Sequence, residues 1–216
     1  SIAYTYYHSI HDDQLVIINL PRSTGYTQTT TNIGRMENKG HELALTLKPL
    51  QGMVEGLNFE LFGAYSQNKN EVITITDDID ELNIGTFGFA AGTTVSIVAK
   101  EGLPFGTFKG NNFKYNDQGQ VIVGADGFPV YPDDDEYLGN NQADYLLNFG
   151  TNINYKGFGL RVLFDMKKGG QFASQTKYNT NFNGTNVNTT IYDRESFIFP
   201  NSVVDNGDGT FSENTV

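Results

Sequence analysis

The chain has 216 residues, of which 38% are hydrophobic and 13% aromatic, and its formal net charge at pH 7 is −11. An acidic chain lacks the basic surface that nucleic acids require, so we expect no nucleic-acid partner. Cysteine is absent, which excludes disulfides and thiolate metal sites. A polar chain that is rich in Tyr, Phe, Gly and Asn is typical of a β-barrel with long loops.

The spacing of apolar residues favours strands over helices as membrane-crossing elements. No run approaches the roughly 18 apolar residues of a transmembrane helix, whereas a barrel strand needs only about 9–11 residues with every second one apolar. We expect a first strand over residues 2–20, where Leu15-Val16-Ile17-Ile18 is a continuous apolar run. We predict that this upper part of the strand leaves the bilayer and packs on both of its faces.

Two further strands are expected over residues 32–48 and 57–68, joined by a turn at 49–56. Their alternating apolar residues are Leu43, Leu45 and Leu47 before the turn, and Leu57, Phe59, Leu61 and Tyr65 after it. This period of two is that of a strand with one apolar face. Phe62 interrupts the polar face, and Gly63 interrupts the apolar one.

The clearest hairpin covers residues 143–155 and 158–168, with Lys156-Gly157 as a two-residue turn. On one face this register pairs Tyr155 with Phe158, Ile153 with Leu160, Thr151 with Val162, Phe149 with Phe164, and Leu147 with Met166. On the other face it pairs Asn152 with Arg161, and Asn148 with Asp165. A slip of one residue would mix the two faces, so their separation supports this register.

The connections between these strands are strongly unequal in length. Short turns at 49–56 and 156–157 alternate with long connections at 21–31, at about 70–140 and after Gly170. Outer-membrane barrels have short periplasmic turns and long extracellular loops. We therefore expect an all-β fold, an antiparallel segment of a transmembrane β-barrel. Because an open sheet edge cannot lie in hydrocarbon, we also expect further strands of the same barrel outside residues 1–216.

The loops carry few recognisable features. A minor hairpin is expected around Gly124 to Gly127, and a turn at Asp205 to Thr210. We interpret the acidic runs Asp77-Asp78-Ile79-Asp80-Glu81 and Asp133-Asp134-Asp135-Glu136 as hydrated loop surface, and leave calcium binding open. No other cofactor is expected. His8 and His11 point to opposite faces of a strand and make a poor metal pair.

Ordered motifs across the chain resemble the SusC/RagA family of TonB-dependent transporters. The motifs are Leu20-Pro21-Arg22-Ser23-Thr24-Gly25, Asn32-Ile33-Gly34-Arg35-Met36-Glu37-Asn38-Lys39-Gly40-His41-Glu42, Glu101-Gly102-Leu103-Pro104-Phe105-Gly106-Thr107-Phe108, Tyr137-Leu138-Gly139-Asn140, and Asp193-Arg194-Glu195-Ser196. His41 departs from the family pattern, which is usually apolar or aromatic there. Gln142-Ala143-Asp144 lacks a frequent proline.

This resemblance implies a 22-stranded barrel in the bacterial outer membrane, with residues 1–216 as one part of it. The plug and the TonB box would lie outside the chain. Such transporters import glycans or peptides too large for porins. Energy reaches them from the TonB–ExbB–ExbD complex, and a SusD-like surface lipoprotein covers the extracellular loops as a lid.

Two sets of candidate site residues follow. Asn148, Asn152, Arg161 and Asp165 are expected to face the lumen, either touching substrate or plug or forming a hydrated wall of cross-strand pairs. The signature residues Asn32, Gly34, Asn38, Lys39, Gly40 and Glu42 are expected to act structurally. In that reading glycine stands where a Cβ will not fit, and Asn38 tolerates a left-handed backbone.

A second function class stays open, namely a secreted β-rich surface-binding module such as a lectin or adhesin. In such a module the apolar face of residues 147–164 would pack against a second sheet of the same chain. In an importer that face would contact lipid. No nucleophile elbow, phosphate loop or dinucleotide motif is present, so no enzymatic activity is expected.

Overall fold

The computed structural model describes residues 1–20, 22–76, 79–89 and 94–216. These form two compact units. The strand unit comprises residues 1–84, 98–107 and 139–171, and the loop unit comprises residues 85–97, 108–138 and 172–216. Among the described residues, no helix is both long enough and apolar enough to cross a membrane.

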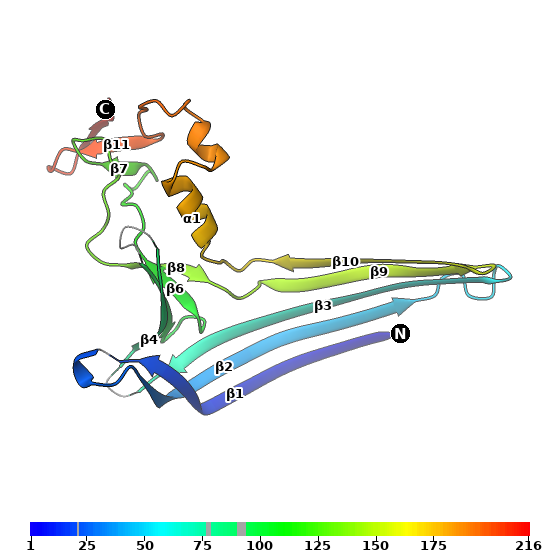
Figure 1. Cartoon of the computed structure of the whole chain (residues 1–216). Helices are drawn as coiled ribbons and strands as arrows, with labels where there is room; N and C mark the ends of the chain where they lie inside the picture. Colours follow the sequence, from blue (N-terminus) through cyan, green and yellow to red (C-terminus); the bar gives the residue numbers. More distant parts are fainter. Residues whose placement is uncertain (21, 77–78, 90–93) are drawn as a thin grey trace. The chain divides into compact units, whose positions relative to one another are not determined.

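The strand unit is built on a five-stranded sheet with the order β1-β2-β3-β9-β10, in which every pair is antiparallel (Figure 1). Its strands are β1 (Ile2–Asn19), β2 (Gln28–Leu47), β3 (Leu57–Thr74), β9 (Tyr145–Tyr155) and β10 (Phe158–Lys168). The five predicted strands and the all-β antiparallel class are therefore confirmed. A 3-10 turn at Arg22–Thr24 lies between β1 and β2.

The predicted hairpin register is also confirmed, since β9 and β10 pair Tyr155 with Phe158 and Phe149 with Phe164. Lys156 adopts a φ of 46° and Gly157 a φ of 90°, which is the left-handed geometry of a two-residue turn. The predicted end of β3 at residue 68 is wrong. Backbone pairing continues to Thr74 because this end of the strand lies against β2.

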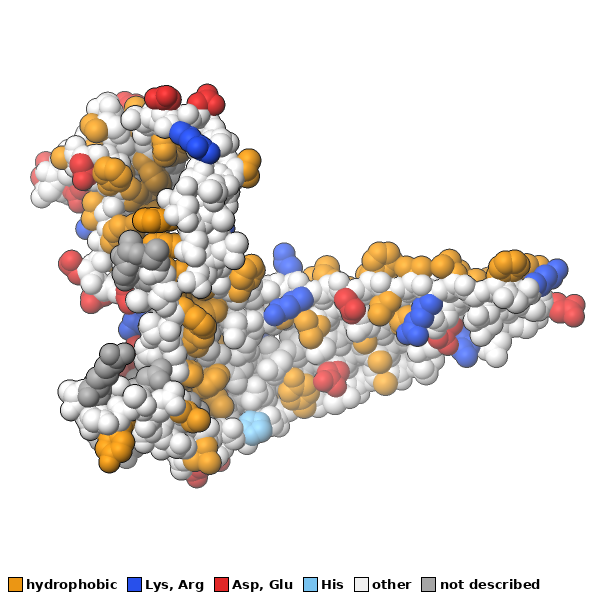
Figure 2. Space-filling view, viewed as in Figure 1, with side chains coloured by type: hydrophobic (Ala, Val, Ile, Leu, Met, Phe, Trp, Pro, Cys, Tyr) orange, Lys and Arg blue, Asp and Glu red, His pale blue; other side chains and the backbone are white. Residues whose placement is uncertain are grey.

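One face of the sheet carries an apolar belt that is five strands wide. Cross-strand partners bring its members into register in rows: Leu47, Leu61, Thr151 and Val162; Ile2, Leu45, Gly63, Phe149 and Phe164; Tyr4, Leu43, Tyr65, Leu147 and Met166. Many of these side chains are uncovered; Leu160 is 57% exposed and Phe164 is 56% exposed. Figure 2 shows apolar side chains gathered along the sheet.

Aromatic rings border the belt at both ends. At the end with the short turns lie Tyr155 and Phe158, and at the other end the rings of Tyr65 and Tyr145 have their centroids 5.6 Å apart. Such aromatic rows mark the two interfaces of an outer-membrane barrel wall.

His41 belongs to the aromatic row and is no exception to it. Its Nδ1 lies 2.9 Å from the Tyr4 hydroxyl, and its ring centroid lies 5.2 Å from that of Tyr6. The histidine that departs from the family pattern therefore packs as an aromatic side chain.

The upper part of β1 differs from its prediction. Leu15 is 74% exposed and Ile17 is 58% exposed, so the face that carries them is not packed as expected. The reason is that β1 is an edge strand with β2 as its partner in the sheet. The side chains of Val16 and Ile18, on the other face, lie outside the described residues.

The long connection after β3 holds more regular structure than its sequence predicts. It contains β4 (Glu81–Gly88), β5 (Thr94–Lys100), β6 (Thr107–Gly110) and β8 (Glu136–Asn140), which form a second sheet in the order β4-β5-β6-β8. Within the strand unit, a small apolar core joins this connection to β3. Its buried members are Val72, Ile75, Leu82 and Ala99.

The loop unit has its own three-stranded sheet, β12-β11-β7, made of β7 (Val121–Val123), β11 (Ser202–Asp205) and β12 (Phe211–Glu213). It also holds α1 (Gln175–Phe182) and the 3-10 helix η3 (Val187–Thr190), neither of which the sequence indicated. The predicted turn at Gly124–Gly127 is confirmed by a bridge between Val123 and Pro129. The predicted turn after Asp205 is confirmed by the pairing of β11 with β12.

Candidate functional site on the polar face of the sheet

The face opposite the belt is polar, and it carries the four candidates expected to face a lumen. Asn148 pairs with Asp165, and Asn152 pairs with Arg161, across β9 and β10. Because side chains alternate along a strand, all four lie on the face away from Phe149 and Phe164. Asp165 and Arg161 are exposed, and the two asparagines are half-buried.

A lower polar cluster forms near the short turns. Asn152 Nδ2 donates to Glu60 Oε1 at 2.9 Å, and Lys48 Nζ lies 3.5 Å from Glu60 Oε2. The Arg161 guanidinium lies 5.6 Å from the centroid of the Phe62 ring. These contacts surround an open cavity of about 360 Å³ that Asn152, Glu60 and Arg161 help to line. Arg161 thus presents its charge on the polar face without a carboxylate partner among the described residues.

Phe62, which interrupts the polar pattern, packs over a glycine. A Cβ on Gly150 would lie 2.7 Å from Phe62 Cζ and 2.3 Å from the carbonyl oxygen of Val162. A second ring–glycine pair lies further along the sheet, where a Cβ on Gly40 would lie 2.2 Å from Tyr7 Cζ. Each aromatic ring fills the space of the missing side chain, which lets a bulky residue lie flat on a polar wall.

An upper polar cluster lies beside this second pair. The Tyr7 hydroxyl donates to Asn68 Oδ1 at 3.0 Å. Asn38 Oδ1 accepts from Asn68 Nδ2 at 3.3 Å and from Asn70 Nδ2 at 3.0 Å. The amides line an open cavity of about 620 Å³, to which Lys167 and Gln142 also contribute.

The Glu101–Phe108 motif supplies a loop that binds to this amide cluster. The Phe105 backbone N–H donates to Asn70 Oδ1 at 2.8 Å. Gln142 Nε2 donates to the Phe105 carbonyl oxygen at 3.1 Å and lies 3.4 Å from Asn70 Oδ1. Directly after the end of β3, the Ile75 N–H donates to Glu101 Oε1 at 2.8 Å. Asn70 therefore holds the loop and the sheet wall together.

Two signature residues of β2, Gly34 and Asn38, lie against β3 or the residue that follows it. Gly34 lacks space for a side chain, because a Cβ would lie 2.8 Å from the carbonyl oxygen of Ile75. Asn38 lies inside a regular strand and pairs with Ser9 and Asn70, so its expected left-handed backbone is wrong. Its side-chain oxygen serves the amide cluster instead, and no backbone freedom is needed there.

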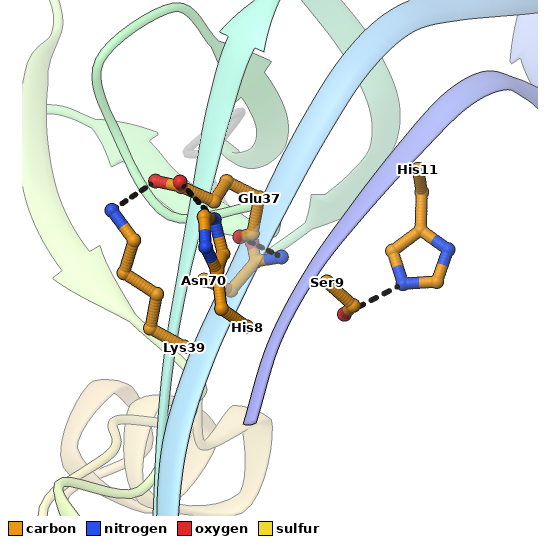
Figure 3. A network of polar contacts seen from close by, with 6 residues as sticks. All are labelled: His8, Ser9, His11, Glu37, Lys39 and Asn70. Carbon is orange, nitrogen blue, oxygen red and sulfur yellow. Dashed lines mark hydrogen bonds and ion pairs between the residues drawn. The ribbon is translucent and has the colours of Figure 1, made fainter. Parts of the chain in front are cut away.

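The remaining signature residues do not join the amide cluster. Lys39 pairs with Glu37 at 2.7 Å, and Glu37 also contacts His8, in the network of Figure 3. These charges lie on the belt face, beyond its aromatic row. Glu42 is exposed on the polar face, and Asn32 is exposed near the N-terminal end of β2.

Sequence reasoning missed Tyr7, Asn68, Asn70 and Gln142. The signal at Asn68 and Asn70 was hidden because the strand was expected to end there. Within the described residues, no group of three or more His, Asp or Glu side chains could hold a metal ion. Pro21 of the first motif and Asp77 and Asp78 of the first acidic run lie outside the described residues.

No family model matches the sequence. TonB-dependent receptors P3 and P26 of Formosa agariphila are 23% identical over 194 residues and 24% identical over 196 residues, covering 81% and 82% of this chain. TonB-dependent receptor SusC of Bacteroides thetaiotaomicron is 27% identical over 156 residues, covering 68% of this chain. The matches cover 19%, 19% and 15% of these relatives, so the chain spans about a fifth of their length or less.

The fold is similar to that of solved RagAB structures. A solved structure of the RagAB peptide transporter matches 76% of this chain and 18% of its own, with a TM-score of 0.54 at 18% identity. The same importer in its "open-open" state matches with a TM-score of 0.52. The sequence relatives and this shared fold agree with the belt, the aromatic rows and the unequal connections. The chain is therefore similar in sequence to TonB-dependent receptors, SusC among them, and similar in fold to the RagAB transporter.

Proposed function

We propose that the protein is a TonB-dependent importer of large nutrients, and that this chain forms a section of its barrel wall. The observation that carries the proposal is the sheet with two unlike faces. One face is an uncovered apolar belt between two aromatic rows, and the other bears amides and charged groups with open cavities. A wall between lipid and a water-filled lumen requires this division.

The belt has the height that a bilayer requires. Its alternating members run from Leu57 to Tyr65 in β3, from Tyr145 to Tyr155 in β9 and from Phe158 to Met166 in β10. These spans match the roughly 9–11 residues of a tilted barrel strand. The open backbone edges of β1 and β10 would then pair with neighbouring strands of the barrel.

The cargo class follows from the polar wall and the relatives. Amide groups both donate and accept hydrogen bonds, so they suit hydroxyl-rich glycans and peptide backbones alike. One structural relative is named as a peptide transporter. We infer that the cargo is an oligosaccharide or a peptide. A SusD-like lipoprotein would cover the extracellular loops, and the TonB–ExbB–ExbD complex would act through parts outside this chain.

The alternative, a secreted lectin or adhesin, would need the apolar belt to be covered. Phe158 is 84% exposed and Leu160 is 57% exposed, so no second sheet among the described residues covers them. An uncovered face of this size would cause aggregation in water. The relatives are named as receptors and transporters, which also favours transport over enzymatic activity.

Spin labels in the full-length protein test the proposed wall. A label at Phe164 should be accessible to oxygen dissolved in lipid, and a label at the adjacent Asp165 should be accessible to a water-soluble nickel complex. The two labels differ by one residue and face opposite sides of β10, so each controls for the other. Equal exposure of both labels to the nickel complex would refute the membrane wall.

Transport is tested separately in the native host. A strain without the gene should lose growth on one polymeric nutrient and regain it when the gene is restored. Wild-type growth of the deletion strain on every glycan and peptide that the parent uses would contradict the importer function.

A further inference from the structure

The loop unit contains a cavity of its own. Its volume is about 390 Å³, which falls within the range of about 300–1,000 Å³ for small-molecule sites. The lining residues come from α1, η3 and the turn that follows them: Asn181, Asn188, Thr189, Tyr192, Arg194, Glu195 and Phe197.

Two stacked rings form one side of the cavity. The ring centroids of Tyr192 and Phe197 are 4.1 Å apart, with an angle of 14° between the ring planes. Tyr192 is 43% exposed and Phe197 is 50% exposed, so the stack keeps ring surface open to a ligand. The electron-rich face of an aromatic ring attracts the weakly positive C–H groups of a flat ligand.

The backbone that presents this stack is strained and held from several sides. Asp193 and Arg194 both adopt positive φ, at 52° and 62°. The Glu195 N–H donates to the Tyr192 carbonyl oxygen at 2.8 Å, and Arg194 Nη2 donates to the Gly184 carbonyl oxygen at 3.0 Å. Positive φ in non-glycine residues persists only where the surroundings impose it, and it is frequent at binding sites.

The polar groups around the stack have hydrogen-bonding capacity to spare. The side chains of Asn181, Asn188 and Glu195 make no hydrogen bond within the part of the chain that the structure describes. An amide offers two donors and an acceptor, and a carboxylate offers acceptors, so together they match neighbouring hydroxyls that each donate and accept. Arg194 and Glu195 bring opposite charges, which leaves the site without a net charge.

We propose that this cavity is a binding subsite for one sugar ring of a neutral glycan. A pyranose has a C–H face that can stack on Tyr192 or Phe197, and hydroxyls at its rim that can reach Asn181, Asn188 and Glu195. A peptide fits less well, because the site lacks a deep apolar pocket for a side chain and an unbalanced charge for a terminus. The inference rests on the proposed importer function and selects its glycan form.

The test uses the purified full-length receptor in detergent on printed arrays of neutral oligosaccharides, acidic oligosaccharides and short peptides. We expect binding to a set of neutral oligosaccharides. Tyr192→Ala should weaken this binding about tenfold or more, as truncation of an aromatic anchor does. Tyr192→Phe keeps the ring and should retain most of the binding, which also guards against loss of folding in the alanine variant. Asn188→Ala should weaken binding without touching the stack.

Phe128→Ala is the matched control, because Phe128 is an aromatic residue of the same unit that is 71% exposed and lies outside the cavity. Oligosaccharide binding that Tyr192→Ala leaves unchanged would overturn the inference. So would Tyr192-dependent binding of peptides or acidic glycans, or an absence of any oligosaccharide binding. None of these results bears on membrane insertion or on nutrient-dependent growth, which the spin labels and the deletion strain measure. Failure of the subsite and failure of the importer function are therefore distinguishable.

Discussion

The strand unit and the loop unit satisfy the hydrogen-bonding groups of their backbones in different ways. In the strand unit, long antiparallel ladders pair almost every residue of β1, β2, β3, β9 and β10 with a neighbouring strand. In the loop unit the ladders are short, and side-chain oxygens accept many of the backbone N–H groups. Asp205 accepts from Gly207, Asp126 from Phe128, and Asn116 from both Gln118 and Gln120.

The difference follows from the solvent of each unit. Hydrocarbon offers no hydrogen bonds, so a membrane wall must satisfy its backbone by strand pairing alone. Water tolerates irregular backbone, and Asp and Asn side chains can then hold tight turns. We therefore expect belt positions to be sensitive to changes of charge and volume, and loop positions to be sensitive to the loss of individual hydrogen bonds.

The largest effect is expected from a charge in the belt. Phe164→Arg should destabilise the folded full-length receptor in bilayers by about 2–4 kcal/mol, the cost of an arginine near the bilayer midplane. The neighbouring Asp165→Arg faces the polar side and should change the free energy of unfolding little. Denaturant titration of both variants in lipid vesicles measures the difference. Equal stability of the two variants would remove the distinction between the faces.

The next effect concerns a ring–glycine pair on the polar face. Gly40→Ala should cost about 1–3 kcal/mol, the usual penalty for overpacking, because its Cβ would meet the Tyr7 ring and the carbonyl oxygen of Gln67. Adding Tyr7→Ala should recover part of that loss, since one of the two clashes disappears. Gly85→Ala is the control, because a Cβ there meets nothing within 4 Å. Additive losses in the double variant would show that the ring is not the obstacle.

Periodicity predicted the five long strands of the strand unit because the side chains on the two faces of each strand meet different surroundings. Alternation at residues 145–166 gave the correct register of β9 and β10, and the turn at Lys156-Gly157 with it. It could not show that Phe62 packs over Gly150, because that contact joins residues far apart in sequence.

The loop connections resisted prediction for a physical reason. Strands such as β7, of three residues, are too short to show alternation, and α1 has no buried residue that would give a helical period. The amide cluster shows the same limit. Asn70 gains its role only when the Phe105 loop, 35 residues later, reaches it.

A more local effect of similar size is expected at Asn70, whose backbone is paired in the sheet and whose side chain accepts a hydrogen bond from a loop N–H. Asn70→Ala leaves the Phe105 N–H without its acceptor, and an unmade hydrogen bond of this kind costs about 1–3 kcal/mol. Hydrogen exchange at the Phe105 amide should accelerate by about tenfold or more, while exchange in the middle of β9 stays unchanged. Asn148→Ala is the control, because the Asn148 side chain makes no hydrogen bond within the described residues. The same acceleration in both variants would mean that Asn70 does not hold the loop.

The smallest effect is expected at Asp208 in the turn between β11 and β12. Its carboxylate accepts hydrogen bonds from the Thr210 hydroxyl at 2.6 Å and from the Thr210 N–H at 2.9 Å. These bonds lower the pKa of Asp208 below its ordinary value, with the hydroxyl as the larger cause. A carboxylate whose pKa is lower in the folded state stabilises the turn at neutral pH and loses that contribution as pH falls through the lowered pKa.

Thr210→Val tests this cause, because it removes the hydroxyl and keeps the backbone N–H. We expect the pKa of Asp208 to rise toward its ordinary value, so the turn should open at a higher pH than in the wild-type protein. Carbon chemical shifts of labelled aspartate carboxyls, followed through an acid titration, measure this pKa directly. An unchanged pKa would show that the backbone bond alone holds the carboxylate. The bond from the Thr210 N–H to the Asp208 carboxylate, which is of the kind that distinguishes the loop unit from the strand unit, would then account for the lowered pKa by itself.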